Sequence, residues 1–475
     1  MDDVVNENET GVKGKLVGGR VLSWRRFLVG PVMVLYMTGY MISYFTITEY
    51  TNAYWKHRKL NEANLADNVT SSENKCDVNA SDPAYKVEDE ATSTASEYIV
   101  YYSLAQGLPG IVSNLVLGAY TDAFGRRFLL GIGITGTTVR LILSVIIIYF
   151  EANLLYFIGA CLIEGCTGQF TTTTQACFVY MGDITDTPAK RTYGMAYVMI
   201  SIATSLTIST YIAGYLIQTF SFLVAMAVAA AILVLALITM MTLLPESYPP
   251  EKRTKSRSIK TMLKNSASFF VTNDERNNRW KYQLLVSAHA LSEFGFIGRI
   301  GVETLYYMAH PFCWSSKGVG LYMAGRTLVV SVFGIGLVGV YRKFLSDVAL
   351  TMLSTASYAV CFLFEALAAT DMMLYIAIAV GCFSGLESVM VRSIASVLTP
   401  ADRQGALFSA LAAVDVTINL LSNVFTGTIY SVTVNYVRGA VFYVLVAVEL
   451  MSCSLLSILL VKWNLEKRKL NIQKI

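Results

Sequence analysis

About twelve long apolar stretches constrain this chain more than any other feature, because each is long enough to cross roughly 30 Å of hydrocarbon as a helix. Apolar residues make up 54% of the 475 residues and charged residues only 15%, which excludes an ordinary soluble fold. The sequence predicts an all-α membrane protein with spans at 28–48, 96–120, 128–149, 153–180, 192–217, 219–244, 281–309, 317–341, 346–368, 370–398, 403–432 and 436–461.

Lysine and arginine residues gather at alternate span ends. Arg126 and Arg127 follow the second span, Lys190 and Arg191 follow the fourth, and basic residues crowd the central loop and the tail. Because positive residues stay on the cytoplasmic side, both termini are predicted to be cytoplasmic. The formal net charge of +4 also raises the alternative of a basic nucleic-acid surface. Charges scattered among span ends disfavour that alternative.

A proline-containing and then basic segment divides the chain into two six-span halves. We predict a cytoplasmic segment at 1–27, an N-terminal bundle at 28–244, a cytoplasmic linker at 245–280, a C-terminal bundle at 281–461 and a cytoplasmic tail at 462–475. Two halves of six spans indicate a pseudo-symmetric architecture. Apolar residues near helical spacing within the linker, from Ile259 to Phe270, favour a short helix on inner-leaflet lipid, and a loose linker is the alternative.

The long first outer loop, 49–95, carries features of an extracellular or luminal segment. Asn68 and Asn79 begin Asn-x-Ser/Thr patterns and are predicted glycosylation sites. Cys76 lies in this loop and Cys313 in the outer loop between spans seven and eight, where an oxidising compartment would preserve a disulfide. Two free thiols are the alternative. The plasma membrane is the predicted location, and the lysosomal membrane is the alternative.

The loop after the second span reads Gly-Ala-Tyr-Thr-Asp-Ala-Phe-Gly-Arg-Arg from Gly118 to Arg127. This pattern resembles the loop between the second and third helices of the major facilitator superfamily. The resemblance implies a major facilitator fold and a charge latch that holds one access state shut. Asp122, Gly125, Arg126 and Arg127 are the matching positions.

Three further stretches resemble solute carrier family 46, which includes the proton-coupled folate transporter. They are His-Pro-Phe-Cys-Trp-Ser-Ser-Lys at 310–317, Gln-Gly-Ala-Leu-Phe-Ser-Ala at 404–410 and Val-Arg-Ser at 391–393. The resemblance implies import of bulky organic anions such as folates, muropeptides or steroid conjugates, often driven by protons. It also implies a bridge between Cys76 and Cys313, and it places the family's acidic residue of span four at Glu164 and its span-ten arginine at Arg392.

The chain departs from that family at two coupling positions. The acidic position of span five falls on Met199, and the coupling histidine of the folate transporter in span seven falls on Phe296. Neither side chain can bind a proton. Folate as the substrate, and the proton route of that member, therefore do not carry over.

Ionisable residues inside the spans are candidate functional residues, because an uncompensated charge at bilayer depth costs at least about 2.5–3.5 kcal/mol. By residue count they lie near mid-membrane at Arg140, Glu164, Asp415 and Glu449, and in the outer half at Arg299, Glu303 and Arg326. Glu49, Glu97 and Glu365 lie near outer span ends and are expected to be solvated.

Span four is the most polar, since Glu164 is followed by Gln169, four threonines and Gln175. A lipid-facing helix could not satisfy so many polar groups, so this span is predicted to line the central cavity. Bonds to neighbouring helices alone are the alternative. Glu164 is the predicted proton carrier, and Gln175 is a predicted substrate contact.

Arg392 is the predicted anion anchor, because a guanidinium offers a planar fork to a carboxylate or phosphate. It lies eight residues before Pro400, so extension to the inner headgroups is the alternative. Asp415, Arg299 and Glu303 are further predicted substrate contacts. Arg299 and Glu303 are four residues apart, which makes an internal ion pair the alternative for them.

Motifs of metalloproteases, P-loop ATPases and α/β-hydrolases are absent from the sequence, so we expect no enzyme, metal or cofactor. The predicted function is proton-coupled import of an organic anion by a monomer or weak homo-oligomer working through alternating access. A passive facilitator and a solute-binding receptor without net transport are the alternatives.

Overall fold

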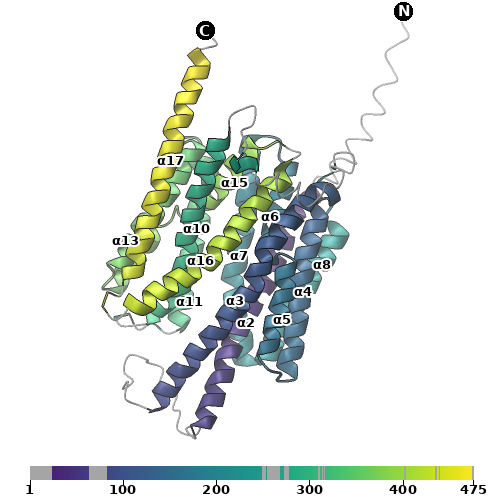
Figure 1. Cartoon of the computed structure of the whole chain (residues 1–475), viewed down its shortest axis with the longest axis vertical. Coiled ribbons are helices and arrows are strands. Elements are labelled where there is room, and N and C mark those ends of the chain that lie inside the picture. The colour runs from purple at the N-terminus through teal and green to yellow at the C-terminus, as the bar shows by residue number, and fades with distance from the viewer. Residues whose placement is uncertain are drawn as a thin grey trace, which may run out of the picture.

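We describe a computed structural model of the chain (Figure 1). The residues that the structure describes are 24–63, 83–248, 253, 268–271, 278–308, 311–312, 314, 316–400, 403–433, 436–437 and 439–472. The predicted glycosylation sites Asn68 and Asn79, both cysteines of the predicted bridge and most of the linker lie outside these residues.

The described residues form two bundles of helices. The N-terminal half contains α2 (Val29–Glu62), α3 (Pro83–Phe124), α4 (Arg126–Tyr149), α5 (Leu155–Cys166), α6 (Gln169–Ile184), α7 (Pro188–Thr219) and α8 (Phe222–Leu243). The C-terminal half contains α10 (Arg279–Met308), α11 (Ser316–Val329), the π-helical η4 (Val330–Ile335), α12 (Val338–Tyr341), α13 (Asp347–Ala366), α14 (Asp371–Val380), α15 (Leu386–Leu398), α16 (Gln404–Thr433) and α17 (Ala440–Ile472). The predicted all-α membrane architecture is confirmed.

Within the described residues, eight helical segments are long and apolar enough to cross a membrane. The other four predicted spans correspond to α3, α5 with α6, α10, and α14 with α15. These four segments are interrupted or carry polar and charged residues, so their helices are shorter or less apolar than the eight that qualify as membrane spans. They include the helices that carry most of the candidate functional residues.

The fourth span of each half is broken near its middle. In the N-terminal half, Gly168 with a φ of 83° and Gln169 with a φ of 54° separate α5 from α6. A Cβ on Gly168 would lie 1.8 Å from the Thr172 hydroxyl oxygen, so glycine is required there by space as well as by conformation. In the C-terminal half, residues 381–385 form turns between α14 and α15. Breaks at corresponding spans are typical of transporters with repeated halves.

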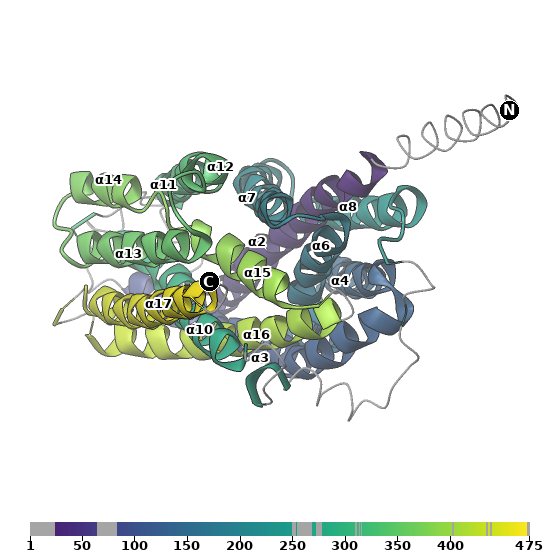
Figure 2. The same cartoon turned by 90° about the horizontal axis from the view of Figure 1, so that it is seen from above.

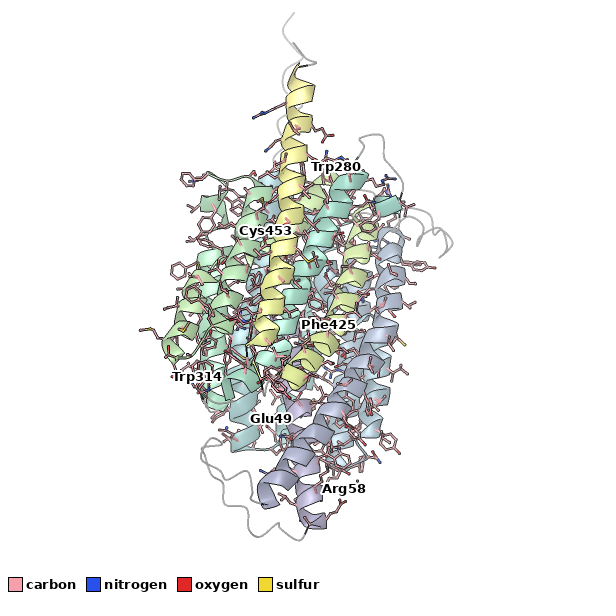
Figure 3. All side chains as sticks on the ribbon, turned by 60° about the vertical axis from the view of Figure 1, so that its left-hand side comes forward. Glu49, Arg58, Trp280, Trp314, Phe425 and Cys453 are labelled. Atoms are coloured by element: carbon pink, nitrogen blue, oxygen red, sulfur yellow. The ribbon has the colours of Figure 1, made fainter. Side chains whose placement is uncertain are left out.

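The bundle has two distinct ends. We call the end where α2 begins and α17 ends the terminal end, and the opposite end, where α2 and α3 project together, the hairpin end (Figure 1). The outer loop predicted at 49–95 is partly helical, because α2 continues to Glu62 and α3 starts at Pro83. The rings of Trp55 on α2 and Tyr98 on α3 pack against each other between these extensions, with their centres 5.4 Å apart. Arg58 lies on the projecting hairpin, beyond the level of Trp314 (Figure 3).

The two halves meet mainly through α3 and α6 against α16, and through α7 against α15 and α11. Seen from the terminal end, α15 and α16 lie against the N-terminal half (Figure 2). This contact brings polar residues from widely separated parts of the sequence to the boundary between the halves.

Candidate functional site

A buried polar network lies at this boundary. His289 on α10 contacts two carboxylates, with Nδ1 2.9 Å from Glu387 Oε1 of α15 and Nε2 2.9 Å from Asp415 Oδ1 of α16. The other oxygen of Asp415 accepts hydrogen bonds from Arg392 Nη2 at 2.9 Å and from Gln175 Nε2 at 2.8 Å. Gln175 belongs to the N-terminal half, so Asp415 connects the two halves.

Local helix geometry places these residues. Residues 381–385 end α14, and α15 restarts so that Glu387 lies in its first turn, where a carboxylate interacts favourably with the helix dipole. Ser354 Oγ of α13 accepts a hydrogen bond from the Glu387 backbone N–H at 2.9 Å. Arg392 lies more than one turn after Glu387 along α15. Its guanidinium donates hydrogen bonds to the hydroxyl and the carbonyl of Ser388, one turn earlier on the same helix.

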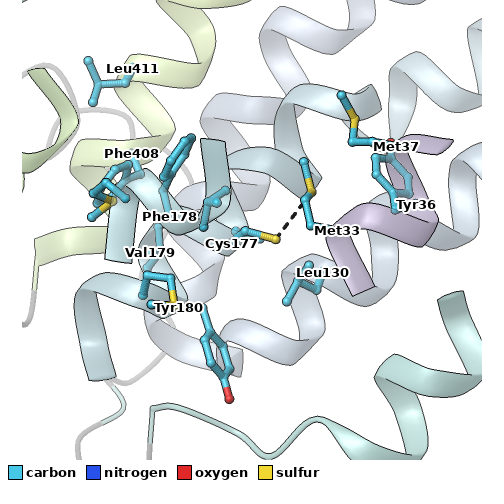
Figure 4. Packing of buried hydrophobic residues seen from close by; sticks show 14 of the residues in the cluster. Met33, Tyr36, Met37, Leu130, Cys177, Phe178, Val179, Tyr180, Phe408 and Leu411 are labelled. Atoms are coloured by element: carbon cyan, nitrogen blue, oxygen red, sulfur yellow. Dashed lines mark hydrogen bonds between the residues drawn. The ribbon is translucent and has the colours of Figure 1, made fainter. Parts of the chain in front are cut away.

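Arg392 faces the opposite half of the protein. Its guanidinium carbon lies 4.9 Å from the centre of the Phe178 ring on α6, and Phe178 stacks on Phe408 of α16 with an interplanar angle of 11° (Figure 4). The Nε of Arg392 is buried and has no hydrogen-bond partner among the described residues. The side chain therefore points into the boundary between the halves, which favours the anion-anchor prediction over extension to the headgroups.

Glu164 lies in a second cluster, inside the N-terminal half. Its carboxylate is 2.6 Å from Arg140 Nε of α4 and accepts hydrogen bonds from Thr137 at 2.7 Å and Gln106 at 2.8 Å. Arg140 also donates to Ser43 of α2 at 2.8 Å. A carboxylate paired in this way is balanced in charge, and protonating it would leave Arg140 without its anionic partner.

A third cluster lies nearer the hairpin end of the C-terminal half. Arg299 Nε is 3.2 Å from Glu303 Oε2, and Arg299 also contacts Glu365 of α13. Arg326 of α11 donates to both oxygens of Glu303, at 2.5 and 3.1 Å. Tyr307 donates to Glu365 at 3.1 Å. The expected solvation of Glu365 is wrong, because its side chain is 0% exposed and its charge is compensated by Arg299. The internal ion pair of Arg299 and Glu303 is present.

The loop matching the predicted latch is tied to the N-terminal half. Arg126 is fully buried, with Nε 2.7 Å from Asp183 at the end of α6 and its guanidinium 4.4 Å from the Tyr248 ring. Glu246 accepts hydrogen bonds from the backbone N–H groups of Arg126 at 2.8 Å and Arg127 at 3.3 Å. The Glu246 carboxylate thus caps the start of α4.

Gly125 provides the turn before α4, with a φ of 102°. A Cβ there would lie 2.5 Å from the Glu246 carboxylate, so a larger residue would displace that cap. The side chain of Asp122 lies outside the described part of the structure, and its pairing with Arg126 stays a prediction.

Polar contacts between the halves gather near the terminal end. Thr192 of α7 and Ser393 of α15 are 2.7 Å apart, and Arg191 donates to the Ser396 carbonyl at 3.0 Å. Ser409 of α16 donates to the Asn114 carbonyl of α3 at 2.9 Å. These contacts close the two halves against each other on the side where α7 begins and α15 ends.

Two pockets differ sharply in character. A void of about 10 Å³ lies between the halves beside Asn114, Gln175 and Ser409, which is room for about one water. A pocket of about 890 Å³ lies between α11, η4 and α14, and its lining is apolar and aromatic. Neither the predicted substrate residues nor Glu164 line the larger pocket.

The structure brings together only part of the predicted site. Gln175, Arg392 and Asp415 meet in the central network, whereas Glu164 lies with Arg140. Arg299 and Glu303 lie about 10 and 14 residues, roughly 15 and 21 Å, further along α10 than His289. The predicted bridge Cys76–Cys313 and the sites Asn68 and Asn79 stay predictions.

Sequence reasoning missed His289 and Glu387 in the network, and Asp183 and Glu246 at the latch. His289 had a usable signal, because it lies two helical turns before Phe296, on the same face of α10.

Met199 and Phe296 do not supply a proton site: Met199 Sδ lies 3.8 Å from the Ser388 hydroxyl, and Phe296 is 36% exposed beside Tyr358.

Comparisons with known proteins agree with this architecture. The family model described as "Major Facilitator Superfamily" matches residues 32–426. The "Proton-coupled folate transporter" of Bos taurus is 25% identical over 398 residues, covering 82% of this chain and 84% of its own length. The "Lysosomal proton-coupled steroid conjugate and bile acid symporter SLC46A3" of Homo sapiens is 24% identical over 447 residues, covering 90% and 94%. The resemblance to solute carrier family 46 is confirmed.

A further relative is the "Probable peptidoglycan muropeptide transporter SLC46" of Drosophila melanogaster, 24% identical over 377 residues and covering 76% of this chain and 72% of its own length. Among solved structures, the human organic anion transporter MFSD10 (TETRAN) superposes with a TM-score of 0.70 at 15% identity, covering 91% of this chain and 99% of that one. The proton:xylose symporter XylE superposes with a TM-score of 0.62 at 13% identity, covering 91% and 95%. These two likenesses show the fold.

Proposed function

The chain belongs to the Major Facilitator Superfamily, and from this premise we propose that it imports an organic anion together with protons by alternating access. It is a multi-pass membrane transporter. The two halves would rock about the central network, which opens first to one side of the membrane and then to the other.

One observation carries the proposal: Arg392 is a buried cation at the boundary between the halves, with an Nε that has no hydrogen-bond partner among the described residues. Its present anionic partner is Asp415, at 2.9 Å. An arriving carboxylate, sulfate or phosphate could take the place of Asp415 on the guanidinium fork. Exchange of one anion for another avoids leaving a buried cation unpaired.

The substrate class follows from this anchor and from the relatives, which are named for folate, steroid conjugates, bile acids and muropeptides. All of these are bulky anions. Because Met199 and Phe296 replace titratable positions of the folate transporter, we favour a muropeptide or a conjugated steroid over folate.

We place the terminal end in the cytoplasm, as the basic span ends predict. The contacts of Thr192 with Ser393 and of Arg191 with Ser396 would then hold the cytoplasmic side closed. The latch of Asp122, Gly125, Arg126 and Arg127 would stabilise this state from within the N-terminal half, where Arg126 pairs with Asp183. The plasma membrane is the proposed location, with the lysosomal membrane as the alternative that one relative's name supports.

Glu164 is the proposed proton carrier of the N-terminal half. Its carboxylate is completely buried, and Arg140 is its cationic partner. Protonating Glu164 would release Arg140 to a second anionic group, which couples proton binding to substrate binding in that half.

The proposal is tested with the purified full chain in proteoliposomes. Uptake of labelled folates, muropeptides and sulfated steroids is measured with and without an inwardly directed proton gradient, and we expect gradient-driven accumulation of at least one of them. Uptake that is indifferent to pH would identify a passive facilitator. Saturable binding without time-dependent accumulation would identify a receptor.

Closure at the terminal end gives a separate prediction. Thr192→Val removes the hydroxyl that contacts Ser393 across the halves without changing the shape of the side chain. A buried hydrogen bond contributes about 0.5–1.5 kcal/mol, so we expect a shift of roughly two- to tenfold toward the state open at this end. Spin-label distances between α7 and α15 measure the shift. Thr204→Val is the control and should leave the distances unchanged, because among the described residues the Thr204 hydroxyl bonds only the Ile200 carbonyl of its own helix.

A further inference from the structure

The contacts of His289 indicate how many protons His289 and its two carboxylate partners hold together. Both ring nitrogens lie 2.9 Å from carboxylate oxygens, one of Glu387 and one of Asp415. A neutral imidazole has one N–H and one lone pair, so it can donate to only one of two ionised carboxylates. The other nitrogen would then face a carboxylate oxygen with no proton between them.

Two protonation states resolve this conflict. In the first, His289 is an imidazolium that donates to both carboxylates. In the second, His289 is neutral, and either Glu387 or Asp415 is a carboxylic acid that donates to the free ring nitrogen. Both states hold the same additional proton. The observed geometry of Glu387, His289 and Asp415 therefore corresponds to a triad that has bound one proton.

The charges around the triad also indicate that it holds one additional proton. With Arg392 included, the two carboxylates and the two cations sum to zero only when the additional proton is present. Without it, the buried group carries a net negative charge, which burial disfavours. The network is therefore more stable in the low-dielectric boundary when the additional proton is bound than when it is absent.

Other titratable groups also face the triad. Glu293 of α10 lies within electrostatic range of His289, Asp415 and Arg392. Glu449 of α17 is 0% exposed, its carboxylate accepts from Ser292 at 3.1 Å, and no salt bridge to it is present in the described part of the chain. Tyr358 of α13 lies within electrostatic range of Glu387, Glu293 and Glu449. Glu293, when ionised, would add negative charge near the triad and favour retention of its proton, whereas Glu449, which forms no salt bridge among the described residues, is favoured by burial in its neutral form.

We propose that Glu387, His289 and Asp415 form a proton-binding site of the C-terminal half, separate from Glu164, and that the proton bound there makes Arg392 available to the transported anion. The part of this inference that concerns transport rests on the proposed function. The proton-binding part rests on the geometry of the triad alone.

The link to Arg392 is electrostatic competition. Asp415 uses one oxygen for His289 and the other for Arg392 and Gln175. In the loaded triad, the additional proton offsets the charge of Asp415, so its hold on Arg392 weakens and an external anion can compete. Loss of the proton restores the full charge of Asp415, which then displaces the anion from Arg392. Proton and anion therefore bind and leave together, as symport requires.

The number of protons carried per anion tests the transport part. In proteoliposomes, one fewer coupled proton lowers the limiting accumulation of substrate about tenfold for each unit of pH difference across the membrane. We expect this loss in His289→Gln and in Glu387→Gln, with exchange of labelled for unlabelled anion at equal pH retained. His57→Gln, at an exposed histidine of the hairpin end, is the matched control and should accumulate substrate as the wild type does.

Glu164→Gln separates the two proposed proton sites. If it alone removes the pH dependence while His289→Gln and Glu387→Gln accumulate normally, the triad does not couple to transport, and the inference is overturned while the proposed function stands. If wild-type protein moves none of the tested anions, the proposed function fails instead.

Proton binding itself is then measured without any substrate. Infrared difference spectra of the purified protein between acidic and alkaline buffer should contain imidazole or carboxyl bands that disappear in both His289→Gln and Glu387→Gln. Identical spectra in the wild type and in both variants would show that the triad binds no proton. Because two separate variants are read by two methods, misfolding of one of them does not decide the outcome.

Discussion

Replacing Arg392 by alanine should abolish uptake of the transported anion. Removing one partner of a buried charge pair costs about 2–5 kcal/mol, which corresponds to a loss of about 30-fold or more in anion affinity. Arg392→Lys should recover part of the activity, because an ammonium retains the charge but not the planar fork that holds a carboxylate or sulfate at two points. Initial uptake rates in proteoliposomes, taken over a range of substrate concentrations, measure both effects.

A matched arginine controls for the loss of charge. Arg58 also pairs with a carboxylate, Glu62 at 3.1 Å, but the pair is exposed on the projecting hairpin (Figure 3). Arg58→Gln should leave uptake unchanged, since exposed ion pairs contribute little. Equal activity of Arg392→Ala and the wild type, with both correctly folded, would remove Arg392 from the binding site.

The second large effect concerns stability. Glu365→Ala should destabilise the C-terminal half by about 3–5 kcal/mol, because Arg299 and Arg326 would then share the single carboxylate of Glu303 and leave one buried positive charge uncompensated. The double variant Arg299→Met with Glu365→Leu removes both members of that pair and leaves the Glu303–Arg326 pair neutral. We expect it to recover most of the lost stability.

Thermal unfolding of the purified protein in detergent measures these differences. Glu62→Ala, which breaks the exposed pair with Arg58, is the control and should unfold at the wild-type temperature. A double variant no more stable than Glu365→Ala would contradict the charge-balance explanation and point to packing around Glu365 instead. Uptake by the folded double variant also tests whether Arg299 contacts substrate, as the sequence predicted.

The fold was largely predictable because hydrocarbon imposes a simple rule on the sequence. Each membrane-crossing segment must be long and mostly apolar, so spans can be recognised without knowing their neighbours. The predicted ends of the first and last spans are too early, because these helices continue beyond the apolar stretch, α2 to Glu62 and α17 to Ile472. The predicted boundaries also miss the breaks at Gly168 and at 381–385, which depend on close packing and local backbone conformation more than on hydropathy.

The site was less predictable, because burial identifies charged residues but not their partners. Glu164 and Arg392 were recognisable as costly charges, yet nothing in the spacing indicates that Glu164 pairs with Arg140 or that Arg392 pairs with Asp415. His289 was overlooked, although it lies two helical turns before Phe296, because that spacing does not identify the partners of the ring. Its role emerges only when Glu387 and Asp415 are found on its two ring nitrogens.

The sequence by itself determined that this protein crosses a membrane many times, that it has two matching halves, and that it resembles anion transporters, because hydropathy, charge asymmetry and short motifs are local properties of the chain. The tertiary structure alone decided how the buried charges are divided into three clusters and which of them faces the boundary between the halves. Electrostatic energy depends on distance in space, and residues 98 to 240 positions apart, such as His289 with Glu387 and Gln175 with Asp415, become neighbours only after the helices pack.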